Sequence, residues 1–95
     1  MPARTGTFSA ELKPRQGKLL RCRLTLEQGI VADIRFTGDF FLIPGDAITQ
    51  LEEVLKGTSV DDIRPCITEF FAEVEVELLG ITPVHFVEVA TMALK

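Results

Sequence analysis

The 95-residue sequence contains no tryptophan and no tyrosine, one histidine and two cysteines. Without Trp and Tyr, phenylalanine must supply the aromatic anchors that commonly dominate protein–protein contacts. His85 is the only imidazole, so a metal site would need carboxylates from elsewhere in the chain. Cys22 and Cys66 lack Cys-x-x-Cys spacing, and we predict that both are reduced residues of the core.

Long hydrophobic runs and targeting signals are also absent. No stretch reaches the roughly 18 apolar residues of a membrane span, and the N-terminal MPARTGTFSA lacks the apolar centre of a signal peptide. We therefore expect a cytoplasmic protein with no membrane partner. The length predicts a single domain over residues 1–95. A content of 46% hydrophobic and 25% charged residues is typical of a globular fold.

Charge is distributed unevenly along the chain. Residues 1–35 carry seven Lys and Arg against three Asp and Glu, whereas residues 36–95 carry three against eleven. An overall charge of −4 makes nucleic acid an unfavourable ligand, so we predict no nucleic-acid partner. The basic N-terminal third either faces an anionic partner or forms solvated strand surfaces.

Alternating apolar residues predict three strands early in the chain. The alternation runs through residues 7–13, 20–26 and 30–36. A two-residue loop between the second and third strands would place Glu27 opposite Ile30 and mix the two faces. A three-residue loop ending at Gly29 avoids this and sets Arg23 opposite Asp33 as an ion pair. The predicted register pairs apolar residues throughout: Leu26 with Ile30, Leu24 with Ala32, Cys22 with Ile34, and Leu20 with Phe36.

Helical spacing dominates the remaining chain. A first helix is expected to end at Gly57, with Glu52 and Glu53 on its outer side. Asp61 or Asp62 is expected to cap a second helix, and Thr82 followed by Pro83 to begin a third. Residues 73–80 suit a short extended segment, with continued helix as the alternative. The apolar stripes are Ala47, Ile48, Leu51, Val54 and Leu55; then Ile63, Ile67, Phe70 and Phe71; then Phe86, Val87, Ala90, Ala93 and Leu94.

Strands that precede helices predict an α+β fold. We expect a three-stranded antiparallel sheet followed by three helices packed on one face. The sequence contains no P-loop, Gly-x-Gly-x-x-Gly, His-Glu-x-x-His or Gly-x-Ser-x-Gly motif. His85 is expected to be an exposed first-turn residue with no nucleophile beside it. The residues therefore predict no catalytic group, no metal site and no cofactor bound by this chain alone.

The segment RFTGDFFLIPGD, residues 35–46, joins the last predicted strand to the first predicted helix. Phe40 and Phe41 follow a Gly-Asp bend, and two adjacent side chains of an extended segment cannot both point inward. One ring is therefore expected near the surface, where a large apolar group often marks a contact site. The alternative is that both rings fold beneath the following helix.

The run over residues 17–44 resembles the accessory domain of lipoate–protein ligases. In that family a Gly-Lys-Leu-(Ile/Val)-Arg strand precedes a Gly-turn hairpin, an Ile-x-Gly-Asp-Phe-Phe-x-x-Pro corner and a helix containing Leu-Glu. Residues 78–90, LLGITPVHFVEVA, also resemble the closing motif of that family. The matching residues are Gly17, Lys18, Leu19, Arg21, Gly29, Gly38, Asp39, Phe40, Phe41, Pro44, Ala47, Leu51, Glu52, Leu55 and Gly57.

The resemblance implies a non-catalytic accessory subunit of a split lipoate–protein ligase. Its expected partner in a heterodimer is the large catalytic subunit, which activates lipoate with ATP to lipoyl-adenylate and lipoylates acceptor lysines. Lipoate, ATP and Mg are implied for the complex, and lipoyl-acceptor proteins are indirect partners. No activity is expected from this chain alone. The initiating Met1 favours a separate chain over a piece of a longer ligase.

Two regions are predicted to contact the partner. Arg21 and Arg35 are secondary candidates, whereas Arg23 is expected to be occupied by Asp33. The predicted contact residues are Gly17, Lys18, Leu19, Gly38, Asp39, Phe40, Phe41 and Pro44.

Two other functions remain as alternatives. Iron–sulfur-cluster scaffold proteins share the general fold type, but they have Gly-Cys where this chain has Gly38 and Asp39. Because cluster assembly needs clustered thiolates, we favour the ligase. The last alternative is a general protein-interaction module.

Overall fold

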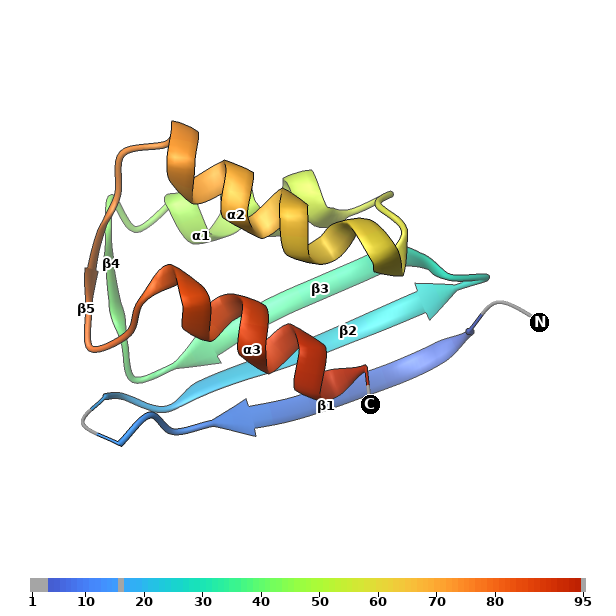
Figure 1. Cartoon of the computed structure of the whole chain (residues 1–95), viewed down its shortest axis with the longest axis horizontal. Helices are drawn as coiled ribbons and strands as arrows, with labels where there is room; N and C mark the ends of the chain where they lie inside the picture. Colours follow the sequence, from blue (N-terminus) through green and yellow to red (C-terminus); the bar gives the residue numbers. More distant parts are fainter. Residues whose placement is uncertain (1–3, 16, 95) are drawn as a thin grey trace.

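The computed structural model describes residues 4–15 and 17–94 (Figure 1). Strands come first and helices dominate the second half, as the sequence predicts. A short 3-10 turn precedes the second helix, and two short strands flank the first two helices. The elements are β1 (Gly6–Leu12), β2 (Leu20–Glu27), β3 (Ile30–Gly38), β4 (Phe41–Ile43), α1 (Ala47–Leu55), η1 (Val60–Asp62), α2 (Ile63–Glu73), β5 (Glu77–Leu79) and α3 (Pro83–Ala93).

The predicted α+β fold is confirmed. Strands β1, β2 and β3 form an antiparallel sheet in that order, and three helices follow. A second, two-stranded sheet pairs β4 with β5 antiparallel. The expected extended segment at residues 73–80 is thus partly helix, because α2 runs to Glu73, and partly the strand β5.

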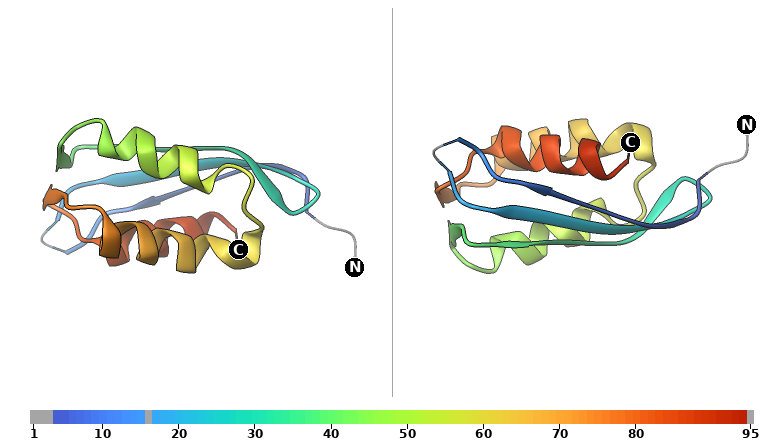
Figure 2. Two further views of the ribbon diagram at one scale, coloured as in Figure 1. Left: turned by 90° about the horizontal axis from the view of Figure 1, so that it is seen from above. Right: turned by 90° about the horizontal axis from the view of Figure 1, so that it is seen from below.

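The helices pack in different ways on the three-stranded sheet. Helix α3 covers β1 and β2, whereas α1 lies along β3, and α2 packs on both α1 and α3. In Figure 2, α1 runs beside β3 at the edge of the sheet, and the buried residues of all three helices belong to one core on the same face of the sheet. None of the helices in the described part of the chain is long and apolar enough to cross a membrane.

The core lies between the sheet and the helices. The predicted inward residues of β2 are all buried, and Phe86 of α3 is fully buried at the centre of an aromatic cluster. The Phe86 ring centroid lies 5.1 Å from that of Phe36, 5.6 Å from Phe40 and 5.2 Å from Phe71. Such edge and tilted contacts add to the burial of each ring. The cluster ties the third strand, the corner and the last two helices together.

The predicted register between β2 and β3 is wrong. A two-residue turn forms at Gln28 and Gly29, with φ of +52° and +78°, and Glu27 lies opposite Ile30. An irregularity between Thr25 and Leu26 then shifts the register, so that apolar residues meet again farther along: Leu26 with Val31, Leu24 with Ile34, and Cys22 with Phe36. One extra residue in β3 allows both a tight turn and a continuous apolar face.

The corrected register changes the outer face of the sheet. Arg23 lies opposite Arg35, so the predicted ion pair between Arg23 and Asp33 is wrong. Asp33 instead lies 3.8 Å from both Arg35 and Lys56.

The orientation of α1 also differs from the prediction. Glu52, expected on the outer side, is 8% exposed, whereas Val54, expected in the apolar stripe, is 49% exposed. The Glu52 carboxylate accepts a hydrogen bond from the backbone N–H of Phe36. This contact turns the helix so that Glu52 faces the edge of β3.

The helix starts fall where the sequence places them. Asp62 lies at the N-cap position of α2, but its side chain makes no capping hydrogen bond to the helix. Its carboxylate instead accepts a hydrogen bond from the Ser59 hydroxyl at 3.0 Å. Thr82 and Pro83 begin α3. His85, expected to be exposed, is half-buried, and its Nδ1 accepts the backbone N–H of Thr82 at 3.0 Å. The imidazole therefore satisfies a backbone N–H group at the start of the helix.

Candidate partner-binding surface

The two predicted contact regions meet at one end of the molecule, at the left of Figure 1. The backbone N–H of Lys18, in the connection between β1 and β2, donates to the carbonyl of Gly80 at 2.8 Å. The N–H of Asp39 donates to the carbonyl of Leu19 at 3.0 Å. Three segments far apart in the sequence are thus joined by backbone hydrogen bonds.

Two glycines allow this close approach. Gly38 has φ of +150°, and a Cβ there would collide with the carbonyl oxygen of Leu19. Gly80 has φ of +93°, and a Cβ there would collide with the side chain of Lys18. An L side chain at either position would meet both an unfavourable φ and an occupied space.

The small β4–β5 sheet carries an exposed apolar strip, which we define as Phe41, Ile43 and Leu79. Phe41 lies opposite Leu79, and Ile43 lies opposite Glu77. Opposite residues of an antiparallel pair project to the same face. The exposed fractions of Phe41, Ile43 and Leu79 are 67%, 52% and 48%. Exposed groups of large apolar side chains often mark interaction sites, which makes this strip the candidate contact surface.

The two adjacent phenylalanines of the corner separate as an extended chain requires. Phe41 belongs to the apolar strip, whereas Phe40 is half-buried with its ring edge-on to Phe86. The alternative, in which both rings fold beneath the helix, does not occur. Phe40 therefore anchors the corner to the core, and Phe41 is free to serve as a contact residue.

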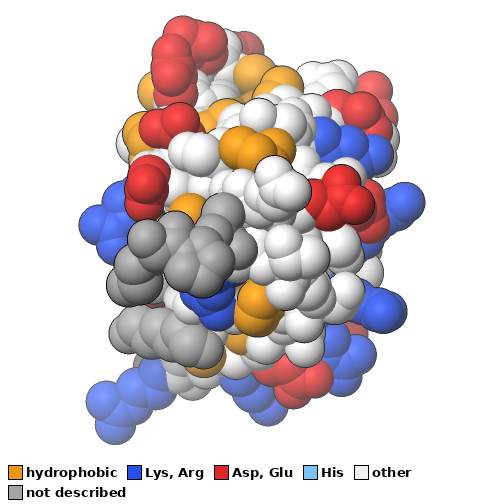
Figure 3. All heavy atoms as spheres, turned by 90° about the vertical axis from the view of Figure 1, so that its right-hand side faces the viewer, with side chains coloured by type: hydrophobic (Ala, Val, Ile, Leu, Met, Phe, Trp, Pro, Cys, Tyr) orange, Lys and Arg blue, Asp and Glu red, His pale blue; other side chains and the backbone are white. Residues whose placement is uncertain are grey.

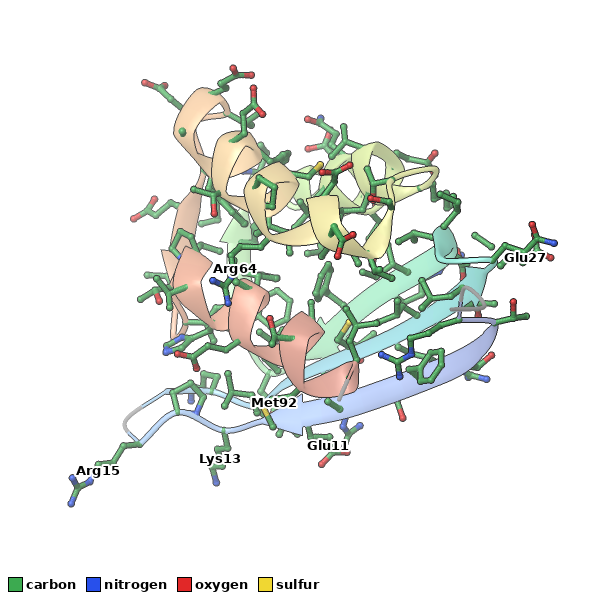
Figure 4. All side chains as sticks on the ribbon, turned by 45° about the vertical axis from the view of Figure 1, so that its right-hand side comes forward. Glu11, Lys13, Arg15, Glu27, Arg64 and Met92 are labelled. Carbon is green, nitrogen blue, oxygen red and sulfur yellow. The ribbon has the colours of Figure 1, made fainter. Side chains whose placement is uncertain are left out.

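Basic side chains lie beside this end. Lys18 is exposed, and Lys13 and Arg15 project away from the body of the protein (Figure 4). Asp39 and Pro44 are exposed as well, whereas Gly17 and Leu19 are half-buried. The structure thus brings together the primary candidates of both regions.

The secondary candidates lie elsewhere. Arg21 and Arg35 are on the outer face of the sheet, where Arg21 lies 2.9 Å from Glu11 and Arg35 lies 3.8 Å from Asp33. Both are already engaged in exposed ion pairs, which contribute little to stability.

Sequence reasoning missed two members of the apolar strip, Ile43 and Leu79. The signal for Ile43 was its place two residues after Phe41 in an extended segment. Leu79 could not be found in this way, because only its pairing with Phe41 places it on the strip. The opposite end, which carries the turn between β2 and β3, shows small separate hydrophobic areas among charged side chains (Figure 3).

The two cysteines are free and lie in separate elements. Burial, with a smaller contribution from Glu52, raises the pKa of the Cys22 thiol to about 12. Burial, followed by Glu69 and Asp62, also raises the pKa of Cys66. Residues 4–15 and 17–94 contain no group of three His, Cys, Asp or Glu side chains that could hold a metal ion. The clustered thiolates that a cluster scaffold needs are therefore not found in this part of the chain.

The structure is a small α+β domain with an exposed apolar strip at one end. The sequence matches the family described as the C-terminus of bacterial lipoate protein ligase over residues 6–89. The chain belongs to this family, and the resemblance seen in the sequence is confirmed.

A protein sequence and a solved structure, both from Thermoplasma acidophilum, support the assignment. Lipoate-protein ligase A subunit 2 is 35% identical over 81 residues, which cover 85% of this chain and 84% of that protein. A solved structure from an archaeal lipoylation system, a bi-partite lipoate protein ligase and its E2 lipoyl domain, contains a similar chain. The TM-score is 0.83 at 31% identity, over 92% of this chain and 97% of that chain.

Proposed function

We propose that this chain is the accessory subunit of a split lipoate–protein ligase and forms a heterodimer with a large catalytic subunit. The observation that carries the proposal is the 35% identity to a ligase subunit 2 over 85% of this chain. The solved relative supports it, because that structure contains a bi-partite ligase. The two free cysteines fit a reducing compartment, in keeping with a cytoplasmic complex.

The complex activates lipoate with ATP and Mg to lipoyl-adenylate and then lipoylates acceptor lysines. The large subunit carries out the bond-making steps. This chain contributes by binding beside the active site, which restricts the motion of nearby loops and excludes water. Water exclusion matters because an acyl-adenylate hydrolyses readily.

The docking surface in this proposal is the apolar strip together with Lys18 and the adjoining connection between β1 and β2. Phe41 is its central anchor, since it is the aromatic member of the strip and has the largest exposed fraction of the three residues. Lys18 is held over Gly80 at the edge of this surface, where it can meet a carboxylate of the partner.

Pyrophosphate release tests the proposal directly. The large catalytic subunit is incubated with lipoate, ATP and Mg, with and without this chain, and this chain is also assayed alone. We expect release only when both chains are present. If the large subunit releases pyrophosphate equally fast by itself, this chain is not an accessory subunit for adenylation.

A further inference from the structure

The outer edge of β3 is closed by other parts of the chain. The N–H of Val31 donates to the carbonyl of Thr58, and the carbonyl of Val31 accepts the N–H of Gly57, both at 2.8 Å. Ile30 forms a bridge with Ser59. Farther along, Glu52 accepts the N–H of Phe36. Several backbone groups at this edge, including both groups of Val31 and the N–H of Phe36, therefore have partners within the chain.

The outer edge of β1 is open. Among the residues that the structure describes, β1 pairs only with β2, and no other segment flanks it (Figures 1 and 2). The strand is seven residues long, contains no proline, and has Glu11 as its only charged residue. Natural sheets commonly protect an exposed edge with lysine, proline, a bulge or a covering segment. Strand β1 shows none of these along its length.

The apolar side of β1 is also incompletely covered. Phe8, Ala10 and Leu12 are half-buried, whereas Leu24 in the neighbouring strand is fully buried. Helix α3, which packs against β1, leaves Met92 42% exposed. A further strand beside β1 would satisfy its backbone groups and cover these side chains together.

We propose that the outer edge of β1 receives a strand from the large catalytic subunit, which extends the three-stranded sheet across the subunit interface. The inference rests on the proposed function above. The added segment would alternate apolar and polar residues, with its apolar side chains directed to the α3 side, beside Phe8 and Leu12. Main-chain hydrogen bonds would supply affinity, as in other cases of strand addition.

Continuity and charge favour this occupant over a second copy of the chain. Strand β1 leads directly into the connection that carries Lys18, so a partner seated at that connection continues along the edge of β1. Two copies of this chain would each bring a net charge of −4 to the contact. Like net charges oppose self-association.

Residue-resolved amide hydrogen exchange tests the proposal on the intact chain. In an antiparallel sheet, successive residues of an edge strand direct their N–H groups alternately toward the neighbouring strand and outward. On addition of the catalytic subunit, we expect exchange to slow by about tenfold or more at alternate residues of β1. The N–H groups of Val31 and Phe36, which are already bonded within the chain, serve as controls.

The outcomes separate this inference from the proposed function. Unchanged exchange in β1, while pyrophosphate release still depends on this chain, would overturn the added strand and leave the accessory role intact. Protection of the outward-directed N–H groups of β1 in the chain alone, with a dimeric mass in light scattering, would identify a second copy as the occupant and overturn the proposal. Failure of the two subunits to bind or to act together would overturn the proposed function itself.

A pair of variants provides a second test. Ser9→Pro and Ala10→Pro remove N–H groups that point in opposite directions, so only one of them removes a hydrogen bond to β2. The variant that keeps the wild-type Tm has lost only an N–H group that points outward, away from β2. Proline is tolerated at such positions of an edge strand. We expect that variant to bind the catalytic subunit about 3- to 10-fold more weakly. If that variant binds with wild-type affinity, strand addition is contradicted. If both variants unfold, the hydrogen-exchange experiment on the wild-type chain decides the question.

Discussion

The backbone N–H of Phe36 donates a hydrogen bond to Oε2 of Glu52 at 2.8 Å, across the junction of β3 and α1. Phe36 is 4% exposed and Glu52 is 8% exposed, so water cannot replace this contact. A buried N–H without a partner costs stability, and Glu52 removes that cost where no neighbouring strand is present. The residue that matches the Leu-Glu helix of the family thus closes a sheet edge.

Removing this carboxylate should destabilise the fold. We expect Glu52→Ala to lower the free energy of unfolding by about 1–3 kcal/mol, because the Phe36 N–H is left buried and unsatisfied. Urea denaturation with an unchanged m value measures the loss. Glu53→Ala is the matched control, since Glu53 is exposed and pairs with the exposed side of Lys56 rather than with a buried backbone group. A Glu52→Ala loss no larger than that of the control would contradict this role.

Stability at alkaline pH should depend on Cys22. Its pKa rises from 9.0 to about 12 in the folded protein, so the native state holds the thiol proton that the unfolded chain releases above about pH 9. The stabilisation is complete below pH 9 and falls by about 1.4 kcal/mol for each pH unit from there toward 12. Urea denaturation between pH 8 and 11 measures this slope.

The variant Cys22→Ala isolates the thiol contribution to that slope. It should be less stable than the wild type at pH 8, because it leaves a cavity, yet lose less stability as the pH rises. Identical slopes for the two proteins would show that Cys22 does not titrate differently on unfolding.

A methyl group at Gly38 should destabilise the corner that follows β3. Gly38→Ala places a Cβ against the Leu19 carbonyl at φ of +150°, whereas Gly57→Ala, at φ of +87°, has no atom within 4 Å of its Cβ. We expect Gly57→Ala to cost about 1 kcal/mol from backbone strain alone. Gly38→Ala should cost more, about 2–4 kcal/mol, because the collision adds to the strain. Thermal unfolding compares them, and equal Tm values would count against the close approach.

Truncation of the exposed ring should weaken binding without weakening the fold. Phe41 is 67% exposed, so Phe41→Ala should leave Tm nearly unchanged while it raises the Kd for the catalytic subunit by about tenfold or more. Val54→Ala, which truncates a residue 49% exposed on α1, is the control and should not change the Kd. Calorimetric titration measures both. A Phe41→Ala affinity equal to that of the wild type would exclude the apolar strip as the docking surface.

Much of the fold could be predicted from periodicity. The three early strands, the three helices and the starts of α2 and α3 follow from local patterns, because each element must bury one face. The separation of Phe40 from Phe41 could also be predicted, since adjacent side chains of an extended segment point in opposite directions.

The errors share one cause. The register of β2 and β3 depends on an irregularity at Thr25 and Leu26, which alternation alone does not reveal. Likewise, Glu52 faces inward because a backbone donor on a distant strand needs an acceptor. In both places, hydrogen-bond geometry overrode the simplest apolar pattern.

The amino-acid sequence by itself determined the type and order of the three long strands and the three helices, the residues of the corner and the family. These depend on local alternation, helical spacing, and the glycines and prolines that end each element. Only the tertiary structure decided that Lys18 meets Gly80 and that Leu79 joins Phe41 in one apolar strip. It also decided that, among the residues it describes, other segments bond to the outer edge of β3 but not to that of β1. The physical reason is that a backbone donor or acceptor at an edge is satisfied by a distant segment, whose position is settled only when the whole core packs.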